Sequence, residues 1–360
     1  MRLRFRVVAA IRHTALRELR AHLESNGMSR SAVRLNPATL NKLRHSLLDW
    51  YDQNRRDLPW RRDADPYRVW VSEIMLQQTR VAAVRDHYAR FLQRFPTVQA
   101  LASAREPSVL AAWSGLGYYH RARRMHQAAK VIARERKGNF PRTAEEWLEL
   151  PGVGRYTAAA VASIAFGEAV AAVDGNVERV LDRMFGRDQG REAPWQRAKA
   201  LLDHERPGDF NQAMMELGAK ICTPRAPQCL LCPLNAWCQS RGAETVRPQA
   251  RRKRKRLCYA LARKNGDVFL VRRPAEASLM AGMWELPAIA EGQQDGHKPG
   301  AKFRHSITDT EYEVLVISLS AEKLPRLETD ARWFSRKQWK KLPLTGLTRK
   351  VLRRLVVESP

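Results

Sequence analysis

Four cysteines in the second half of the chain have the spacing of a metal site. Their pattern is C-x6-C-x2-C-x5-C, with prolines in the intervening loop, and the residues are Cys222, Cys229, Cys232 and Cys238. Thiolates that converge on one centre can hold an iron–sulfur cluster or a structural zinc ion. The spacing alone permits either metal. Cysteines this crowded do not look like a secreted disulfide framework, and they fit a reducing compartment.

Two carboxylates stand where they could help to break a bond. Glu73 lies in the apolar stretch 70–76 of a predicted helix, where burial would raise its pKa and keep it protonated as a general acid. The alternative is a solvent-facing Glu73 on the polar side of that helix. Asp174 follows the apolar run 170–173, where a carboxylate can cap a helix or stand in a pocket. Local sequence favours the plainer alternative for each residue.

A glycine-rich turn separates two predicted helices, 144–150 and 156–166. The turn reads Leu150-Pro151-Gly152-Val153-Gly154. Backbone N–H groups at a helix N-terminus that follows such a turn can bind a phosphate. Taken alone, the turn can equally be a plain connection between helices.

Hydrophobic periodicity indicates the elements that position these residues. A helical face recurs over 40–51, and helical patterns follow at 69–76, 81–91, 109–113, 122–134, 144–150, 156–166 and 177–184. The period then changes to that of strands at 258–262 and 268–271, on either side of Asn265-Gly266, a dipeptide suited to a hairpin turn. Further strands are predicted at 312–319 and 331–334, and a closing helix at 349–357.

These patterns divide the chain into segments of different character. Residues 1–36 form a basic extension without a predicted fold, which fits an organelle presequence, a basic arm or an upstream extension before Met28. Residues 37–245 form a mainly helical domain that ends with the cysteines. Residues 246–257 read as a basic, solvated linker, and residues 258–360 as a small α/β domain.

The charge balance favours a polyanionic partner. The chain has 64 lysines and arginines against 37 acids, a formal net charge of +27, which suits nucleic acid or an anionic membrane surface. The run 251–256 supplies six of these charges by itself, so charge alone does not separate a DNA-binding face from a solvated segment. No apolar run approaches the length of a membrane span. We expect no membrane partner, a monomer, and a cytoplasmic, nucleoid-associated location, with organelle targeting by the extension left open.

Combined, these motifs resemble the endonuclease III and MutY superfamily of helix–hairpin–helix DNA glycosylases, over roughly 41–334. The cysteines follow the segment 210–218 as they do in the [4Fe–4S] loop of that superfamily. The segment Trp70-Val71-Ser72-Glu73-Ile74-Met75-Leu76-Gln77-Gln78-Thr79 is similar to the long signature of the MutY family. The resemblance implies a multidomain protein, with a mainly α helix–hairpin–helix glycosylase domain that carries a [4Fe–4S] cluster loop and a C-terminal α/β Nudix-like domain.

The resemblance also implies a reaction, the removal of adenine paired with 8-oxoguanine or guanine in double-stranded DNA. In the family, the residue at Glu73 protonates adenine N7, and the residue at Asp174 stabilises the oxocarbenium character of the sugar. Tyr156 stands where bifunctional relatives carry a lysine, and a phenol cannot form a Schiff base. A monofunctional glycosylase is therefore expected, with Tyr156 supporting the sugar. The alternatives are an endonuclease III-like glycosylase and lyase, and a noncatalytic iron–sulfur DNA-binding protein.

An enzyme of this class must extrude its base from the duplex. Tyr118 is a candidate wedge, and Arg121, Arg123 and Arg124 after it are candidate phosphate ligands. Core packing is the alternative for one of Tyr118 and Tyr119. By resemblance, Gln78 enters the base stack. The other contacts that the resemblance implies for DNA or adenine are Arg56, Leu58, Trp60, Arg61, Thr79, Gly152, Gly154, Asn176 and Glu216.

The C-terminal region resembles the Nudix-like domain of the MutY family in the segments 272–274 and 281–287. Few acidic residues are available there to hold magnesium, so nucleotide hydrolysis is not expected. In the family this domain reads 8-oxoguanine with a Phe-Ser-His loop. Here Phe303-Arg304-His305-Ser306 matches the approach to that loop, but Ile307-Thr308-Asp309 replaces the loop itself. His305, Ser306 and the hydroxyl of Thr308 are therefore the expected lesion contacts.

Overall fold

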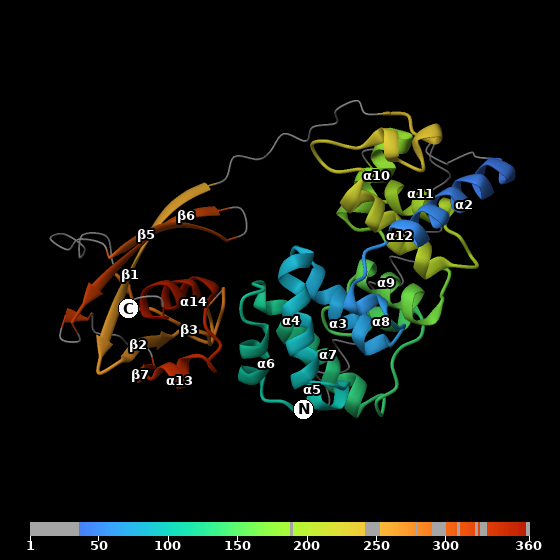
Figure 1. The fold of residues 1–360 in the computed structure, drawn as a ribbon. Coiled ribbons are helices and arrows are strands. Elements are labelled where there is room, and N and C mark those ends of the chain that lie inside the picture. Colours follow the sequence, from blue (N-terminus) through green and yellow to red (C-terminus); the bar gives the residue numbers. More distant parts are fainter. Residues whose placement is uncertain are drawn as a thin grey trace. The chain divides into compact units, whose positions relative to one another are not determined.

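The computed structural model describes residues 36–187, 190–241, 253–277, 279–289, 300–307, 310–320, 323–324 and 330–357. The chain forms two compact units, one of Met1–Arg55 with Ala169–Val246 and the other of Arg56–Glu168 with Arg247–Pro360. The predicted helical region 37–245 thus contributes to both units (Figure 1). The predicted basic extension lies outside the described residues, apart from its last residue. None of the described helices is long and apolar enough to cross a membrane.

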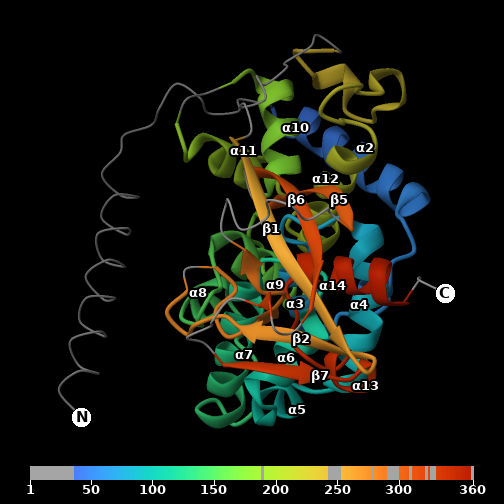
Figure 2. The same cartoon turned by 90° about the vertical axis from the view of Figure 1, so that its left-hand side faces the viewer.

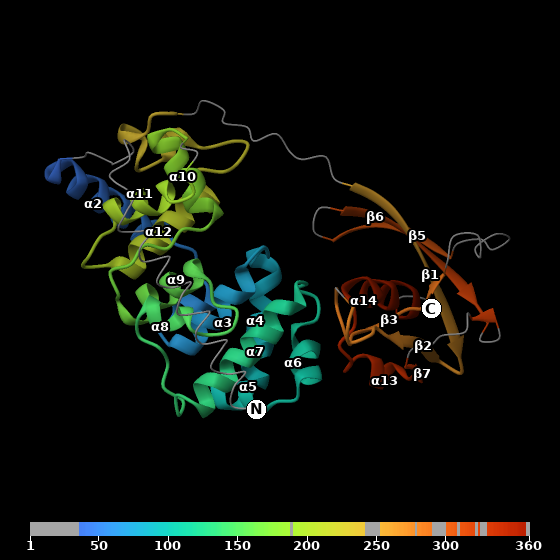
Figure 3. The ribbon, with the colours of Figure 1, turned by 180° about the vertical axis from the view of Figure 1, so that it is seen from behind.

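The first unit is helical. Its helices are α2 (Pro37–Asn54), α10 (Gly175–Phe185), α11 (Ala193–Leu201) and α12 (Pro207–Lys220), followed by the short turns η2 (Cys229–Leu231) and η3 (Asn235–Trp237) (Figure 3). Helix α2 begins where the Asn36 side chain accepts a hydrogen bond from the backbone of Thr39, with proline at the first helical position. The predicted apolar face of α2 is confirmed, since Leu43 and Leu47 are fully buried against α10 and α12. Helices α11 and α12 were not predicted.

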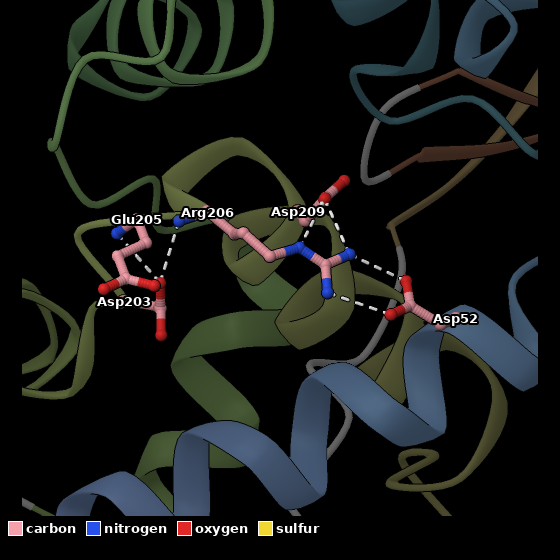
Figure 4. Close-up of polar contacts among 5 residues, drawn as sticks. All are labelled: Asp52, Asp203, Glu205, Arg206 and Asp209. Carbon is pink, nitrogen blue, oxygen red and sulfur yellow. Dashed lines mark hydrogen bonds and ion pairs between the residues drawn. The ribbon is translucent and has the colours of Figure 1, made fainter.

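A charged network joins the end of α2 to the start of α12 (Figure 4). The Arg206 guanidinium donates two hydrogen bonds to the carboxylate of Asp52, at 2.9 and 2.8 Å, and its Nε and Nη2 atoms donate to Asp209 at 3.0 and 2.8 Å. The Asp203 carboxylate accepts the backbone N–H of Arg206 at 2.8 Å and of Glu205 at 3.0 Å. The hydrogen bond from Arg206, partly offset by burial, lowers the pKa of Asp52.

We expect Arg206→Gln to lower the free energy of unfolding by about 1 kcal/mol at neutral pH, since the network is partly exposed and screened by solvent. Because the pKa of Asp52 is lowered in the folded state, its contribution is present above its ordinary pKa of 3.8 and is lost as the pH falls through the lower folded value. The difference between variant and wild type should therefore shrink below about pH 4. Urea unfolding at several pH values measures it, with the exposed Arg191→Gln as control. A constant difference down to pH 2 would contradict this assignment.

The second unit contains a group of helices and a sheet. The helical elements are η1 (Pro59–Arg61), α3 (Pro66–Leu76), α4 (Val81–Arg94), α5 (Val98–Ser103), α6 (Glu106–Trp113), α7 (Tyr119–Arg134), α8 (Ala144–Leu148) and α9 (Arg155–Phe166). Helix α3 starts before its predicted apolar face because Asp65 caps it, accepting the backbone N–H of Arg68 at 2.8 Å, and Pro66 follows. Helix α9 is rich in buried alanine, which allows close packing with its neighbours. Helix α5 was not predicted.

The strands of the described residues form one mixed sheet, in the order β3-β2-β1-β6-β5, of which β2, β1, β6 and β5 are labelled in Figure 2. They are β1 (Lys253–Lys264), β2 (Asp267–Arg272), β3 (Trp284–Glu285), β4 (Ala288–Ile289), β5 (Ala301–Ile307), β6 (Thr310–Leu319) and β7 (Ala331–Phe334), of which β4 pairs with β1 and β7 with β2. Strands β1 and β6 are parallel, and the other pairs are antiparallel. The predicted hairpin turn is confirmed, with φ of 52° at Asn265 and 82° at Gly266.

One face of the sheet is covered by the last helices of the chain. These are α13 (Arg336–Trp339), α14 (Gly346–Leu352) and a π-helical turn over Arg353–Val357. Leu347 and Val351 of α14 pack with Val314 and Val316 of β6 in one buried cluster. The closing helix was predicted to begin at Arg349. It begins earlier because the Thr345 side chain accepts the backbone N–H of Thr348 and caps it.

The prediction of a linker over 246–257 is wrong at its C-terminal end. Residues Lys253–Arg256 belong to β1 and pair in parallel register with Thr310–Glu313 of β6. Two ion pairs accompany this register, Arg254 with Glu311 at 3.4 Å and Arg256 with Glu313 at 3.0 Å. A basic run reads as solvated in the sequence, but here a distant acidic strand pairs with it.

Candidate active site and metal centre

Glu73 is buried in the second unit and is paired with Tyr156. Its side chain, on α3, is 6% exposed, and the Tyr156 hydroxyl, in the first turn of α9, donates a hydrogen bond of 2.5 Å to Glu73 Oε2. The solvent-facing alternative for Glu73 is therefore wrong. The hydrogen bond fixes the position of the Glu73 carboxyl group between α3 and α9. The structure thus brings together two predicted site residues that lie 83 positions apart in the sequence.

The glycine-rich turn before α9 has the expected form. Gly152 has φ of +80°, and a Cβ atom there would clash with Cβ of Arg124. Glycine is required at this position both by the backbone conformation and by the close approach of α7. Gly154 is the N-cap of α9, and no side chain caps the helix. The N-terminus of a helix that follows such a turn is a place where backbone N–H groups can bind a phosphate.

The two glycines offer a matched pair of substitutions. We expect Gly152→Ala to destabilise the protein by at least about 2 kcal/mol, because it adds left-handed strain and a clash with Arg124. Gly154→Ala should cost less than about 1 kcal/mol, since its added Cβ meets nothing within 4 Å. Thermal unfolding measures both effects. Equal melting temperatures for the two variants would show that the turn yields to the extra methyl group.

Asp174 in the first unit caps α10. Its Oδ1 atom accepts the backbone N–H groups of Asn176 at 2.9 Å and Val177 at 2.8 Å, and its Oδ2 atom accepts the side-chain amide of Asn176 at 2.9 Å. The capping interpretation is confirmed. Capping does not exclude chemistry, because the three donors hold a half-buried carboxylate in one orientation.

A chain of hydrogen bonds that no sequence motif predicts leads from Asp174 toward the cysteines. Arg179 donates from Nη2 to Oδ1 of Asn176 and to the carbonyl of Gly218, both at 2.8 Å, and from Nε to the carbonyl of Cys222 at 2.9 Å. A Cβ atom at Gly218 would lie 2.6 Å from Cβ of Asn176, so glycine is needed where α12 passes α10. The spacing of Asn176 and Arg179 within one helix turn is a local signal, but their partner at Cys222 is not.

The four cysteines line one pocket in the first unit, together with apolar side chains of α10 and α12. Arg183, which is 4% exposed, donates to Sγ of Cys222 at 3.2 Å and to the carbonyl of Thr223 at 2.8 Å. Among the described residues, no three histidine, cysteine, aspartate or glutamate side chains are arranged to hold one metal ion directly. The four cysteine side chains therefore line the wall of a pocket and do not converge on one point.

Electrostatics disfavour four bare thiolates in this pocket. Burial and, to a smaller extent, the neighbouring cysteines raise the pKa of the Cys232 thiol to about 11. Burial also raises the pKa of Cys229, with Cys238 and Cys222 as further causes. Thiolate ligands become stable when a metal supplies the compensating positive charge. The donor set therefore fits a cationic group with sulfur ligation.

Gln78 and Tyr118 lie on two turns in the helical part of the second unit. Gln78 is exposed with φ of 55°, and Tyr118 is half-exposed with φ of 47°. Tyr119, by contrast, is 4% exposed, so the core alternative applies to Tyr119. The prediction that Arg121 binds phosphate is wrong: its side chain is 6% exposed and donates to backbone carbonyl groups. Arg124 remains exposed, whereas Arg123 pairs with Glu106 at 2.9 Å.

The predicted adenine-pocket residues have different environments. Leu58 and Trp60 are 2% and 6% exposed, and Trp60 packs edge-on against Tyr88 with ring centroids 5.3 Å apart. The Arg61 side chain donates to the Arg56 carbonyl at 3.5 Å, and both arginines are half-buried. Glu216, on α12 in the first unit, is fully buried. The leucine and the tryptophan therefore belong to the packed core around their turn.

The predicted lesion contacts fall near the β5–β6 hairpin. His305 is half-buried on β5, opposite Tyr312, and burial followed by the charge of Lys350 lowers its pKa. Ser306 lies on β5 opposite Glu311. Thr308 lies outside the described residues.

Comparisons with known proteins agree with this arrangement of helices and hairpin. The model of the HhH-GPD superfamily of base excision DNA repair proteins matches residues 71–202. Adenine DNA glycosylase of Homo sapiens is 51% identical over 219 residues, which cover 57% of this chain and 40% of the human protein. Adenine DNA glycosylase of Schizosaccharomyces pombe is 34% identical over 340 residues, 74% of each chain. The solved structure of a thermostable thymine-DNA glycosylase has 32% identity and a TM-score of 0.52, covering 56% of this chain and 97% of that chain.

The helical fold, the glycine-rich turn between α8 and α9, and the superfamily match together define the class of protein. It is a helix–hairpin–helix protein of base excision DNA repair. The chain spans 40% of the length of the human relative, whereas it spans 74% of the fission yeast relative. On the strength of the latter match, the chain belongs to the adenine DNA glycosylase family, the MutY family.

Proposed function

We propose that the protein is a monofunctional DNA glycosylase that removes adenine paired with 8-oxoguanine or guanine. The observation that carries this proposal is the buried Glu73 with its hydrogen bond from Tyr156. A carboxyl group in a water-poor environment can deliver a proton to a base, and the neighbouring phenol, by donating to Oε2, holds the group so that Oε1 can carry that proton. Protonated adenine is a better leaving group, so the glycosidic bond breaks with less charge on the base.

In the proposed reaction, Asp174 acts on the sugar. As the base departs, positive charge develops on the sugar ring, and a fixed carboxylate lowers the energy of that transition state. The donors from Asn176 and Val177 hold Asp174 in place before the reaction, so little reorganisation is needed when charge develops. Water then adds to the sugar and completes hydrolysis.

Tyr156 separates this proposal from a glycosylase and lyase. A lyase needs an amine that attacks the sugar and forms a Schiff base, after which the strand is cut. The side chain at the start of α9 is a phenol whose proton is already donated to Glu73. We therefore assign Tyr156 to orienting Glu73 and the sugar, and the product is an abasic site in an intact strand.

One assay tests the reaction and its rivals. Duplexes with adenine opposite 8-oxoguanine, adenine opposite guanine, and thymine opposite guanine are incubated with the protein, and strand breaks are compared before and after alkali. Breaks that need alkali, and only at adenine, are the expected result. Breaks without alkali would indicate a lyase. Release of thymine would match the thymine-DNA glycosylase that this chain resembles, and tight binding without breaks would indicate a noncatalytic protein.

We also propose that the four cysteines hold a [4Fe–4S] cluster. A ring of sulfurs around a pocket suits a cluster, whose iron atoms lie between the thiolates, better than a single zinc ion at one point. When bound, the cluster would cross-link the loop that follows α12. The Arg183 hydrogen bond to Cys222 Sγ is of the kind that orients a ligand sulfur.

We expect Cys232→Ser to lose the bound iron and the broad visible absorbance of an iron–sulfur cluster. The first unit should also become less stable by several kcal/mol, because metal binding and folding of the loop are coupled. Metal analysis, absorbance and thermal unfolding measure these changes, with the buried Cys258→Ser of β1 as a control that keeps the cluster. Stoichiometric zinc in the wild-type protein would overturn the cluster assignment.

The partner that we propose is double-stranded DNA bound by a monomer, with the C-terminal sheet reading the 8-oxoguanine. A mixed sheet with α14 on one face supports a Nudix-like domain. His305 and Ser306, at the end of β5, precede the predicted lesion loop. The assay above tests this role directly, since a domain that reads 8-oxoguanine makes adenine opposite 8-oxoguanine a better substrate than adenine opposite guanine.

A further inference from the structure

Two turns in the helical part of the second unit hold non-glycine residues in the left-handed backbone region. The first turn joins α3 to α4 and contains Gln78, with φ of 55°; the second joins α6 to α7 and contains Tyr118, with φ of 47°. This conformation is uncommon for residues with a Cβ atom and persists when surrounding contacts impose it. Both residues are candidates for entering the base stack in the proposed function.

A single buried arginine contacts both turns. Arg121 lies in the first turns of α7 and is 6% exposed. Its Nη1 atom donates to carbonyls at the end of α3 and beyond it, those of Ile74, Met75 and Gln77. Its Nη2 atom donates to Thr79 Oγ1 at 3.1 Å, and to the carbonyls of Leu116 and Gly117, each at 3.4 Å.

The Arg121 guanidinium also lies over two aromatic rings, one at the end of α6 and one in the second turn. Its central carbon lies 5.4 Å from the ring centroid of Tyr118 and 5.4 Å from that of Trp113. The Trp113 indole in turn donates to the carbonyl of Gly117 at 3.1 Å. Burial lowers the pKa of Arg121 to about 10, which leaves the group charged at neutral pH. A buried cation that binds carbonyl groups at two helix junctions is well suited to fix loop geometry.

We propose that Arg121 is a positioning residue for base extrusion, which clamps the turns 76–79 and 115–118 to each other and so fixes where Gln78 and Tyr118 meet the duplex. This inference rests on the proposed function, because it requires that the protein unstacks its target base. Arginine is needed since its two terminal nitrogens reach two turns at once. A lysine has one terminal nitrogen with three N–H groups, which cannot serve the six acceptors that Nη1 and Nη2 of Arg121 share between the two turns.

The test separates extrusion from chemistry by using the Glu73→Gln protein, in which the base stays attached. The DNA duplex in this test carries the fluorescent base 2-aminopurine in place of adenine, opposite 8-oxoguanine. The fluorescence of 2-aminopurine rises when that base leaves the stack. We expect Glu73→Gln with Arg121→Lys to bind the duplex but to unstack the base about 10- to 100-fold more slowly, because small displacements of positioning groups have effects of this size. Thr79→Val, which removes one acceptor of Arg121, should act in the same direction more weakly. Arg134→Met, at the exposed end of α7, is the matched control and should change nothing.

The fluorescence results distinguish a failure of the Arg121 clamp from a failure of the proposed glycosylase function. If Glu73→Gln raises the fluorescence and the added Arg121→Lys leaves its rate and amplitude unchanged, the clamp is refuted while base extrusion stands. If Glu73→Gln itself never raises the fluorescence of bound DNA, the proposed function fails, and the clamp fails with it. Thermal unfolding identifies a merely structural effect: a lower melting temperature with normal unstacking of the folded protein would also refute the positioning role.

Discussion

Glu73→Gln is expected to lower single-turnover excision of adenine by about 10²- to 10⁴-fold, the range that general acid catalysis contributes. Glutamine has the size of glutamate, and its carbonyl oxygen can accept the Tyr156 hydroxyl that Glu73 Oε2 accepts at 2.5 Å. The amide cannot deliver a proton to the base. The substitution therefore removes the chemistry of the carboxyl group and keeps the packing between α3 and α9.

DNA binding and the variant Tyr156→Phe test whether Glu73→Gln acts on the proton-transfer step alone. DNA binding by the Glu73→Gln variant should equal that of the wild type, since the lost step follows binding. Tyr156→Phe, which removes the hydroxyl and keeps the ring, should lower the rate less than Glu73→Gln, because it disturbs the orientation of the acid and leaves the acid itself. Undiminished excision by Glu73→Gln would show that the proton comes from another group, whatever the binding result.

The sequence predicts the centres of the helices better than their ends. The apolar face of α3 is visible in the periodicity, but its start at Pro66 depends on the cap at Asp65. The basic residues Lys253–Arg256 read as a linker because their acidic partners on β6 lie more than fifty positions away in sequence. Hydrophobic periodicity reflects interactions between residues that are close in sequence. The start of β1 depends instead on pairing with β6, which is distant in sequence.

In the candidate site, too, local motifs predict individual residues but not the contacts between them. Glu73, Asp174 and the cysteines follow from motifs, since each motif is local. The pairing of Glu73 with Tyr156 is not local, because it requires that α3 and α9 pack together. Arg121 looks like a surface cation in a basic helix, and no acidic partner in the sequence indicates burial. Its partners are backbone carbonyl groups at helix ends, which no residue type reveals.

Asp174→Asn is expected to lower excision by about 10²- to 10³-fold, the effect of removing one preorganised electrostatic group from a transition state. Asparagine is as good an N-cap as aspartate, so the α10 cap should survive. The carbonyl oxygen of the new side chain would take the two backbone N–H groups, which turns its NH₂ group toward the amide of Asn176. Asn176 cannot simply rotate its amide, because its Oδ1 atom accepts from Arg179 at 2.8 Å. A local cost of about 1 kcal/mol in stability should therefore accompany the loss of charge.

The structure offers a variant that separates the two effects. In the double variant Asp174→Asn with Asn176→Asp, the amide at position 174 donates to the carboxylate at position 176, and that carboxylate still accepts from Arg179. Every hydrogen bond of the network has a partner again, and the net charge is that of the wild type. Melting temperature should recover, whereas excision should stay about 10²-fold below wild type, because the charge no longer stands at position 174. Recovery of excision together with stability would mean that Asp174 acts only as the cap of α10.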